Sequence, residues 1–376
     1  MRPLKNSAAA ADKETPMKHD EKYMRHALQL AMRAKGKTLP NPMVGCLIVK
    51  GGTIVGEGWH KRCGGAHAEI FALRQAQDRS MGATMYVTLE PCAHQGHTPP
   101  CVDQVIASGV KRIVIAAQDP NPLVRGRSIK KLKWAGVDVV VGVLQEEAVA
   151  LNRAFNKYIT QKMPFVTAKI AQSLDGKVAT SDGGSKWITS LESRRYARKK
   201  RDEFDAILVG VNTVLKDDPQ LNPATKRKPW TKIVVDSSLR IPLKARMFRD
   251  FSCVVATTAK ASKRKIALLE QKNIQVVICP ERAGRVDLRW LMEFLVRQEI
   301  SNILIEGGSA VIGQALALKL VDRMMVYVAL KIFGDETALD AVRGLRAHNV
   351  GKTVELNDVS VMAMGRDLYI EGKVKY

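Results

Sequence analysis

The sequence predicts two α/β domains that follow one another along the chain. Its 376 residues exceed what one hydrophobic core usually serves, and 46% of them are apolar. Strand-like and helix-like segments alternate in both halves, which is typical of α/β layers. A polar connection at residues 161–164 separates the two series. We therefore expect a disordered tail over residues 1–20, one domain over 21–160 and a second over 165–376.

The first domain is expected to contain a largely parallel sheet. Residues 23–35 have apolar side chains at helical spacing, and a hairpin is expected around Gly51 and Gly52, with strands at 44–49 and 53–57. The other expected elements are helices at 67–77, 100–108, 129–135 and 146–159, and strands at 84–89, 112–117 and 137–143.

The second domain is expected to be another α/β layer with no sequence repeat of the first. Its expected strands cover residues 166–171, 206–209, 233–236, 254–257, 274–278, 303–306 and 324–328. Helical segments fall between several of them, as a layered fold requires.

The formal net charge of +23 is spread over both halves. The basic residues are dispersed, apart from short clusters such as those at residues 198–201 and 226–228. Such a surplus can attract phosphate-bearing ligands or bind nucleic acid without sequence preference. We favour a solvated surface that assists phosphate capture and expect no specific nucleic-acid partner.

Six cysteines are present, and only Cys92 and Cys101 fall in a motif-like setting, so no disulfide framework is indicated. This favours a reducing, cytoplasmic compartment. No apolar run approaches the roughly 20 residues that span a bilayer, and the first 20 residues lack the apolar centre of a secretory signal. No membrane partner is expected, and self-association into a homo-oligomer stays open.

A zinc site is predicted in the first domain. His67 and Glu69 form a His-x-Glu motif at the start of an expected helix, and Cys92 and Cys101 follow later. One imidazole and two thiolates suit zinc and leave the fourth position for water, whose pKa the metal lowers to about 7. In zinc nucleobase deaminases the Glu of this motif is not a ligand but transfers protons. The opposing interpretation makes His67 a surface residue and both cysteines buried thiols, and it leaves the order of the motifs to chance. His60, His94 and His97 are interpreted as loop or pocket residues.

Three segments resemble the bifunctional riboflavin-biosynthesis deaminase/reductase family: residues 41–45, 67–69 and 88–101. Eight residues separate Cys92 from Cys101. This spacing distinguishes the three segments from those of transfer-RNA adenosine deaminases, in which two residues separate the corresponding cysteines. Residues 119–122 and Gly126 also fit, although Ser128 stands where the family usually has glycine. The resemblance implies a cytidine-deaminase-like domain that acts on a phosphoribosylamino-pyrimidine. It makes His67, Cys92 and Cys101 zinc ligands, Glu69 the catalytic proton carrier and Asn41 a pyrimidine contact; alternatively, Asn41 is a turn residue before Pro42.

The second half resembles the reductase domain of the same family through residues 171–177, 185–189, 209–221 and 306–310. The resemblance implies a dihydrofolate-reductase-like fold and NADPH as cofactor. The implied cofactor contacts are Ala171, Trp187, Thr213, Asp217, Ser237, Gly308, Ser309, Ala310, Val311, Ile312, Gly313 and Gln314. The implied substrate contacts are Ser185, Arg201, Leu221 and Glu306, with Arg201 as a cation for the phosphate.

Some of these residues have plainer explanations. Gly307 and Gly308 can form a tight strand-to-helix turn, although a glycine pair there also lets backbone N–H groups meet a pyrophosphate. Arg201 can be a solvated charge in the cluster at 198–201. The family tends to have an arginine three residues after Leu221, where this chain has Ala224, so Lys226 or Arg227 is a candidate replacement.

Two other functions remain open from the sequence. A nucleic-acid base deaminase with an added binding domain fits the charge, but it predicts the short cysteine spacing and leaves residues 185–187 and 306–309 unexplained. A zinc-dependent binding protein without enzymatic activity requires a fourth protein ligand, for which His94 or His97 is nearby.

Overall fold

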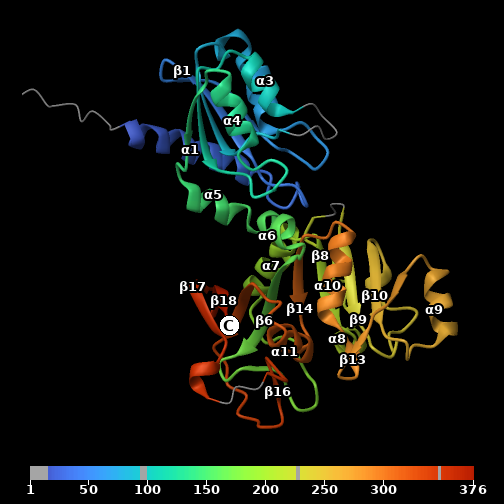
Figure 1. Ribbon diagram of the computed structural model, residues 1–376. Helices are drawn as coiled ribbons and strands as arrows, with labels where there is room; N and C mark the ends of the chain where they lie inside the picture. Colours follow the sequence, from blue (N-terminus) through green and yellow to red (C-terminus); the bar gives the residue numbers. More distant parts are fainter. Residues whose placement is uncertain (1–15, 94–99, 226–228, 346–348) are drawn as a thin grey trace, which may run out of the picture. The chain divides into compact units, whose positions relative to one another are not determined.

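The computed structural model describes residues 16–93, 100–225, 229–345 and 349–376. The chain divides into two compact units, Met1–Asn156 and Lys157–Tyr376 (Figure 1). Among the described residues no helix is long and apolar enough to cross a membrane.

The first unit is built on a five-stranded sheet. Its strands are β1 (Gly45–Lys50), β2 (Thr53–Trp59), β3 (Thr84–Leu89), β4 (Arg112–Ala117) and β5 (Asp138–Val141). Its helices are α1 (Pro16–Met32), α2 (Ala68–Ala76), α3 (Cys101–Ala107), α4 (Arg127–Trp134) and α5 (Gln145–Leu151), and α6 (Arg153–Gln161) begins in it.

The sheet is mixed rather than largely parallel. Its order is β2-β1-β3-β4-β5; β1 is antiparallel to both neighbours, and β3, β4 and β5 are parallel. The tight turn at Gly51 and Gly52, both at positive φ, joins β1 to β2 and forces that pair to be antiparallel.

Two glycines let helices approach the two faces of this sheet closely. A Cβ on Gly45 would lie 1.9 Å from the carbonyl oxygen of Ala27 in α1. A Cβ on Gly58 would lie 2.4 Å from the carbonyl oxygen of Ala68 at the start of α2. Gly58 pairs with Cys46, the neighbour of Gly45, so the glycines face opposite sides. The sheet is therefore covered on both faces, and the start of α2 is fixed against β2.

Two expectations for the helices of this unit are wrong. The expected helix over 146–159 is interrupted at the buried Asn152, whose side-chain amide bonds both the N–H and the carbonyl of Met43, at 2.8 and 2.9 Å. The first helix begins at Pro16, inside the expected tail. Asp20 in that helix is held by Arg112 and by the Tyr86 hydroxyl.

The second unit is built on a nine-stranded sheet with the order β11-β10-β9-β8-β14-β6-β15-β18-β17. These strands are β6 (Phe165–Ser173), β8 (Ala206–Gly210), β9 (Thr231–Val235), β10 (Ser252–Thr257), β11 (Gln275–Ile278), β14 (Asn302–Glu306), β15 (Arg323–Ala329), β17 (Glu355–Met364) and β18 (Asp367–Lys375). Short strands outside this sheet are β7 (Lys177–Ala179), β12 (Glu281–Arg282), β13 (Arg285–Val286) and β16 (Leu339–Asp340). The helices are α7 (Leu191–Lys200), α8 (Val211–Asp217), α9 (Lys263–Glu270), α10 (Leu288–Arg297) and α11 (Ser309–Ala317).

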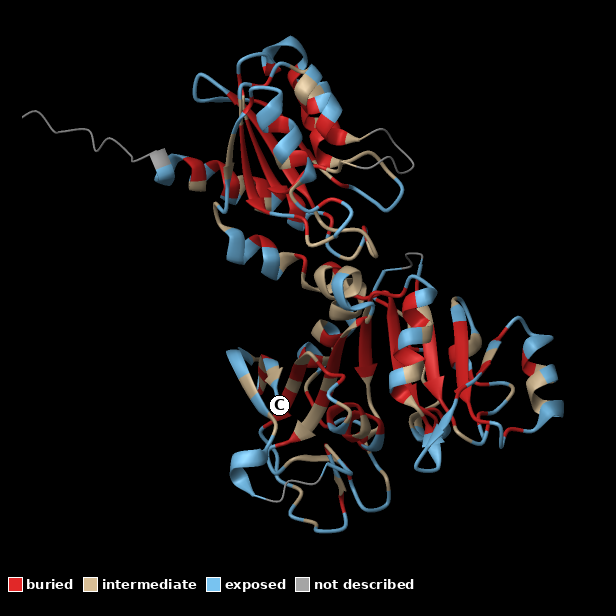
Figure 2. Cartoon of the chain, viewed as in Figure 1, coloured by how far each residue is buried: buried red, intermediate tan, exposed pale blue. Residues whose placement is uncertain are grey.

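Seven neighbouring strands of this sheet, from β11 to β15, are parallel, and β18 and β17 add an antiparallel edge. Its two faces form separate cores. Leu208 packs with α10 and α11 residues, whereas its neighbours Ile207 and Val209 pack with α7, α8 and α9 residues. The central strands are accordingly buried (Figure 2). The parallel strands bring their carboxyl ends to one edge, which is where open α/β sheets bind ligands.

Candidate active sites

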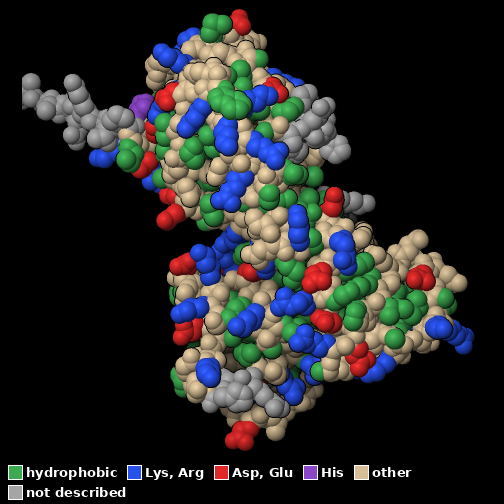
Figure 3. Space-filling model, in the orientation of Figure 1, with side chains coloured by type: hydrophobic (Ala, Val, Ile, Leu, Met, Phe, Trp, Pro, Cys, Tyr) green, Lys and Arg blue, Asp and Glu red, His purple; other side chains and the backbone are tan. Residues whose placement is uncertain are grey.

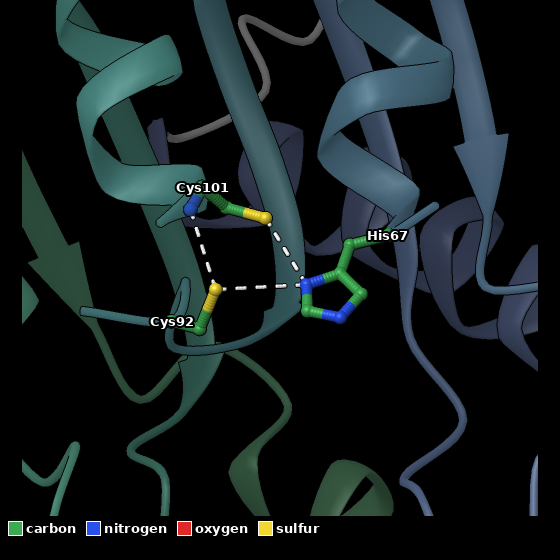
Figure 4. A group of neighbouring side chains, drawn as sticks. All are labelled: His67, Cys92 and Cys101. Atoms are coloured by element: carbon green, nitrogen blue, oxygen red, sulfur yellow. Dashed lines mark hydrogen bonds between the residues drawn. The ribbon is translucent and has the colours of Figure 1, made fainter. Parts of the chain in front are cut away.

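The three predicted zinc ligands meet in the first unit. His67 is the N-cap of α2, Cys101 is the first residue of α3, and Cys92 lies in the loop after β3 (Figure 4). Their ligand atoms all lie within 4.8 Å of one another. The structure thus brings together residues that are 34 positions apart in the chain.

The cluster has the dimensions of a zinc site. The Nδ1 atom of His67 is 3.1 Å from the Cys101 sulfur and 3.6 Å from the Cys92 sulfur. In a tetrahedral zinc site, bonds of roughly 2.1 and 2.3 Å place N and S ligand atoms roughly 3.5 Å apart. Zinc therefore fits with little movement of these side chains.

The local environment also prepares a thiolate. The contact with the Cys101 thiol, and then the contacts with His67 and the Cys101 N–H group, lower the pKa of Cys92 to about 4. The contact with Cys92, together with burial, raises the pKa of Cys101. These contacts therefore favour the thiolate form at Cys92, which is the form that binds a metal.

Glu69 lies in the first turn of α2, two residues after His67, and is only 3% exposed. Burial raises the pKa of its carboxyl group. A carboxyl group with a raised pKa can accept a proton and then release it, as a proton carrier must.

The other predicted residues of this unit have distinct surroundings. His60 is buried, donates to the carbonyl of Ala66 through Nδ1, and has its ring edge-on to His67, outside the ligand cluster. Asn41 is half-buried, and its backbone N–H bonds the carbonyl of Thr38, while its side chain is not part of the described cluster. His94 and His97 lie outside the described residues.

Ser128, which replaces a family glycine, has a structural role. It is fully buried, and its hydroxyl donates to the carboxylate of Glu90 at 2.6 Å. The same carboxylate accepts the N–H groups of Asp119, Gly126 and Ile129. Glu90, next to Pro91 and Cys92, thereby fixes the loop from Asp119 to α4 against the end of β3.

The second unit contains a cavity of ≈ 670 Å³ at the carboxyl edge of its sheet. Residues from β6, β14, α8 and the segment 183–189 line it. The predicted residues in its wall are Ala171, Ser185, Trp187, Arg201, Thr213, Asp217, Leu221, Glu306, Gly308, Ser309, Ala310 and Ile312. The volume suits ligands of the size expected of a cofactor and a small substrate.

Four predicted cofactor contacts lie outside this wall. Ser237 and Gln314 both bond Val286, the first accepting its N–H and the second donating to its carbonyl. Val311 and Gly313 are buried in α11, and a Cβ on Gly313 would lie 1.9 Å from the carbonyl oxygen of Arg343. Their roles toward the cofactor stay predictions.

Arg201 and Glu306 form the central ion pair of the cavity. Arg201 donates through Nε and a terminal nitrogen to the two carboxylate oxygens of Glu306, and its other terminal nitrogen donates to the carbonyl of Asn222 at 2.8 Å. Burial acts to raise the pKa of Glu306, but the positive charges of Arg201 and Lys169 outweigh it, and the net pKa is lowered. The charge of Arg201 is therefore already neutralised within the site.

The cavity also fits a dinucleotide at the turn before α11. Gly307 and Gly308 have φ values of 90° and 82°, a conformation that favours glycine. A Cβ on Gly308 would lie 3.6 Å from both the Gly210 nitrogen and the Thr213 hydroxyl, so the wall is close but open there. Backbone N–H groups at the start of α11 can meet phosphate oxygens.

Sequence reasoning missed several basic and polar residues of the wall, among them Lys169, Asn212, Arg246 and Arg343. Lys169 could have been found, because it lies two residues before Ala171 on β6 and shares its face. Arg246 and Arg343 carry no local signal, since long-range packing places them. The candidates Lys226 and Arg227 lie outside the described residues.

Comparison with known proteins resolves the family. Residues 164–370 match the family model of the RibD C-terminal domain, and residues 17–117 match the cytidine and deoxycytidylate deaminase zinc-binding region. The riboflavin biosynthesis protein RibD of Aquifex aeolicus is 43% identical over 93% of this chain and 97% of its own length. The RibD protein of Escherichia coli is 41% identical over 84% of this chain and 89% of its own length. The chain belongs to the RibD family.

Solved structures agree with this assignment. Acinetobacter baumannii RibD has a TM-score of 0.85 at 32% identity, covering 96% of this chain and 100% of that chain. A Thermotoga maritima diaminohydroxyphosphoribosylaminopyrimidine deaminase/5-amino-6-(5-phosphoribosylamino)uracil reductase has a TM-score of 0.82 at 33% identity, covering 95% and 99%. As a RibD-family protein, this chain is a bifunctional deaminase and reductase of riboflavin biosynthesis. The predicted fold class and the predicted cofactors, zinc and NADPH, are confirmed, and the two alternative functions are set aside.

Proposed function

We propose that the first unit deaminates 2,5-diamino-6-(5-phosphoribosylamino)pyrimidin-4-one and that the second reduces the ribose side chain of the resulting uracil to ribityl. The observation that carries the deamination step is the cluster of His67, Cys92 and Cys101 with the buried Glu69 beside it. The substrate is the one named for the T. maritima relative.

His67, Cys92 and Cys101 would hold zinc, which polarises a water molecule for attack on the ring carbon that bears the amino group. Glu69 would take one proton from the attacking water and give it to the ring nitrogen. It would then move a second proton, from the hydroxyl now on the ring carbon, to the amino group, which leaves as ammonia as the carbonyl forms. Burial of Glu69 supports this role, because its raised pKa lets it carry the proton. Asn41 would orient the pyrimidine.

In the second unit, NADPH supplies the reducing equivalents, with the turn at Gly307 and Gly308 as its proposed phosphate contact. Ser185, Leu221 and the Arg201–Glu306 pair would hold the phosphoribosyl chain of the substrate. Glu306 orients Arg201 through two hydrogen bonds, so Arg201 can present its remaining N–H groups in a fixed direction.

The test is a two-readout assay on the purified chain with the diaminopyrimidine substrate. Ammonia release and loss of reduced nicotinamide absorbance should both occur, and a chelator that removes zinc should stop both. Adding the deaminated uracil should restore NADPH oxidation under chelation, because the reductase does not need zinc. If chelated enzyme still releases ammonia, or if the uracil is not reduced, the corresponding half of the proposal fails.

We also propose that the enzyme works in the cytoplasm without a specific nucleic-acid partner. None of the six cysteines, all of which lie in described residues, is joined in a disulfide, which suits a reducing compartment. On the face shown in Figure 3, Lys and Arg side chains are scattered over both units with acidic groups between them. Nucleic acid should therefore bind weakly and lose affinity steeply with salt, whereas tight sequence-selective RNA binding at physiological salt would contradict this.

A further inference from the structure

The reductase cavity is lined by seven basic side chains that differ in their existing partners. They are Lys169, Lys186, Arg194, Arg201, Lys216, Arg246 and Arg343. A phosphorylated substrate and a dinucleotide both need cations in such a site, and a cation already neutralised by a carboxylate attracts an anion less.

Of the seven, Arg201 is the side chain most strongly paired with an acidic group. Both carboxylate oxygens of Glu306 accept hydrogen bonds from it, and the side chains of this pair are only 18% and 10% exposed. A phosphate that approaches the pair therefore meets little net charge. A second cation is needed to give the substrate phosphate a strong site.

Two other basic side chains, Lys186 and Arg194, also have partners. Lys186 lies 3.9 Å from a carboxylate oxygen of Asp217. The guanidinium of Arg194 stacks 3.9 Å from the centre of the Trp187 ring and donates to the carbonyl of Thr189. These contacts hold both side chains in the segment at 185–194.

Lys169 and Lys216 also face acidic groups. The charge of Glu306 acts on Lys169 inside the site, and Lys216 lies close enough to Asp182 to help lower its pKa. Within the described ranges, no ion pair or side-chain hydrogen bond is found for Lys169, Lys216, Arg246 or Arg343. Because the two lysines each face a carboxylate, Arg246 and Arg343 are the better candidates to bind an anion.

Arg246 and Arg343 lie in different parts of the wall. The backbone N–H of Arg343 bonds the carbonyl of Ser309, which places it at the start of α11 beside the expected cofactor turn. The backbone N–H of Arg246 bonds a carboxylate oxygen of Asp218 at 2.8 Å. Four residues further on, Asp250 accepts from the side chain of Asn222 at 3.0 Å.

These two bonds fasten the segment 246–250 along the segment 218–222, which carries Leu221. Arg246 is therefore on the substrate side of the cavity, and Ala224, three residues after Leu221, has no charge to offer. An arginine can bind a phosphate through two parallel N–H donors.

We propose that Arg246 is a specificity-determining residue of the reductase and binds the phosphate of the phosphoribosyl substrate. The assignment rests on the proposed reduction of a phosphorylated uracil. The two arginines then have different roles. Arg201, held by Glu306, orients the phosphoribosyl chain of the substrate, and Arg246 supplies a positive charge that no carboxylate neutralises.

The test compares Arg246→Ala and Arg246→Gln with wild type on two reductase substrates, the phosphorylated deaminated uracil and its phosphate-free analogue. Loss of a charge-assisted contact should raise KM for the phosphorylated substrate by about 10- to 100-fold. KM for the analogue and for NADPH should stay unchanged, and Arg246→Lys should recover part of the loss. Arg249→Ala is the matched control, because it removes an exposed arginine from the same segment outside the cavity wall.

Thermal unfolding of the variants should match wild type, which separates lost binding from lost folding. If KM is unchanged in both variants, rises equally for both substrates, or rises for NADPH instead, the assignment to Arg246 is wrong. A wild-type enzyme that reduces neither uracil would instead overturn the proposed function, and the assignment with it.

Discussion

The zinc cluster and the reductase cavity are assembled in different ways. In the first unit, three ligands and Glu69 come from two helix starts and one loop, and the chemistry is confined to atoms within a few ångströms. In the second unit, residues from at least five segments between Lys169 and Arg343 surround one wide cavity. The first site depends on short motifs, whereas the second depends on how a whole sheet edge is put together.

The two sites also differ in how their charges are balanced. The zinc cluster offers only neutral or anionic ligand atoms, and the mutual hydrogen bond of its two thiols lowers the pKa of Cys92 and raises that of Cys101. The reductase cavity already contains many charges, and the Arg201–Glu306 pair cancels two of them. A change in one residue should therefore have a sharper effect in the first site than in the second.

The largest effect is expected from Glu69→Gln. Glutamine keeps the shape of the side chain but cannot carry a proton, a role worth roughly 100- to 10,000-fold in rate. Deamination, measured as ammonia release, should fall by that factor while zinc content stays at one ion per chain. Reduction of the pre-deaminated uracil should be unaffected.

Cys92→Ala is the matched control for this variant, because it should lose the zinc as well as the activity. Ammonia release at the wild-type rate by Glu69→Gln would remove the proposed proton carrier. A loss of zinc by Glu69→Gln would instead make Glu69 a ligand and change the character of the first site.

Gly308→Val is the mirror experiment in the second unit. Valine at a φ of 82° is strained, and its methyl groups would enter the space beside Thr213 and Gly210. We expect kcat/KM for NADPH to fall by about 10- to 100-fold, because the added methyl groups crowd the proposed phosphate contact, and crowding of this kind costs roughly 1–3 kcal/mol. Zinc content and deamination should not change.

Gly284→Val is its control, because Gly284 has a φ of 76° and open space around it, in the turn between β12 and β13. It should show the backbone strain without the loss of cofactor binding. Equal losses in the two variants would mean that Gly308 serves only the turn. With wild-type enzyme, equal rates with NADH and NADPH would contradict the predicted cofactor preference.

The sequence predicts the two sites unequally for physical reasons. His67, Glu69, Cys92 and Cys101 could be found because metal ligands need particular residue types at helix starts, and those types are rare enough to form a pattern. The central strands could be found because buried parallel strands have continuous apolar runs. The edge strand β17 could not, since its burial is low along most of its length.

Long-range contacts are what the sequence could not supply. Nothing local shows that Asn152 breaks a helix to bond Met43, that Arg246 joins the substrate wall, or that Ser128 bonds Glu90. Each of these depends on a partner far along the chain. The remaining predictions test two of them.

Asn152→Ala tests whether the deaminase site of the first unit also depends on a contact far from its sequence motifs. The variant leaves the N–H and carbonyl of Met43 without their partner, at a cost of about 2 kcal/mol for buried polar groups. Because Met43 follows Asn41 closely, we expect KM for the diaminopyrimidine to rise several-fold and the first unit to unfold at lower urea. Asn156→Ala, whose amide donates to the carbonyl of Val149 at an exposed position, should have a smaller effect. Equal effects of the two variants would show that the segment at 41–43 is held by other contacts.

The smallest effect is expected from Ser128→Ala, and it compares the two units directly. Each unit has a buried carboxylate that accepts a serine hydroxyl and backbone N–H groups: Glu90 with Ser128, and Asp205 with Ser301. Removing either hydroxyl leaves the carboxylate with its N–H donors, so each variant should lose only about 1–2 kcal/mol of unfolding free energy. The effect of Ser128→Ala should be measured by urea unfolding with zinc release as the signal. The effect of Ser301→Ala should be measured by urea unfolding with loss of reductase activity as the signal. Because the chain divides into two compact units, each variant should shift only its own transition. If Ser128→Ala also lowered the urea concentration at which reductase activity is lost, the two units would not unfold independently. The zinc site would then depend on the whole chain and not only on its own unit.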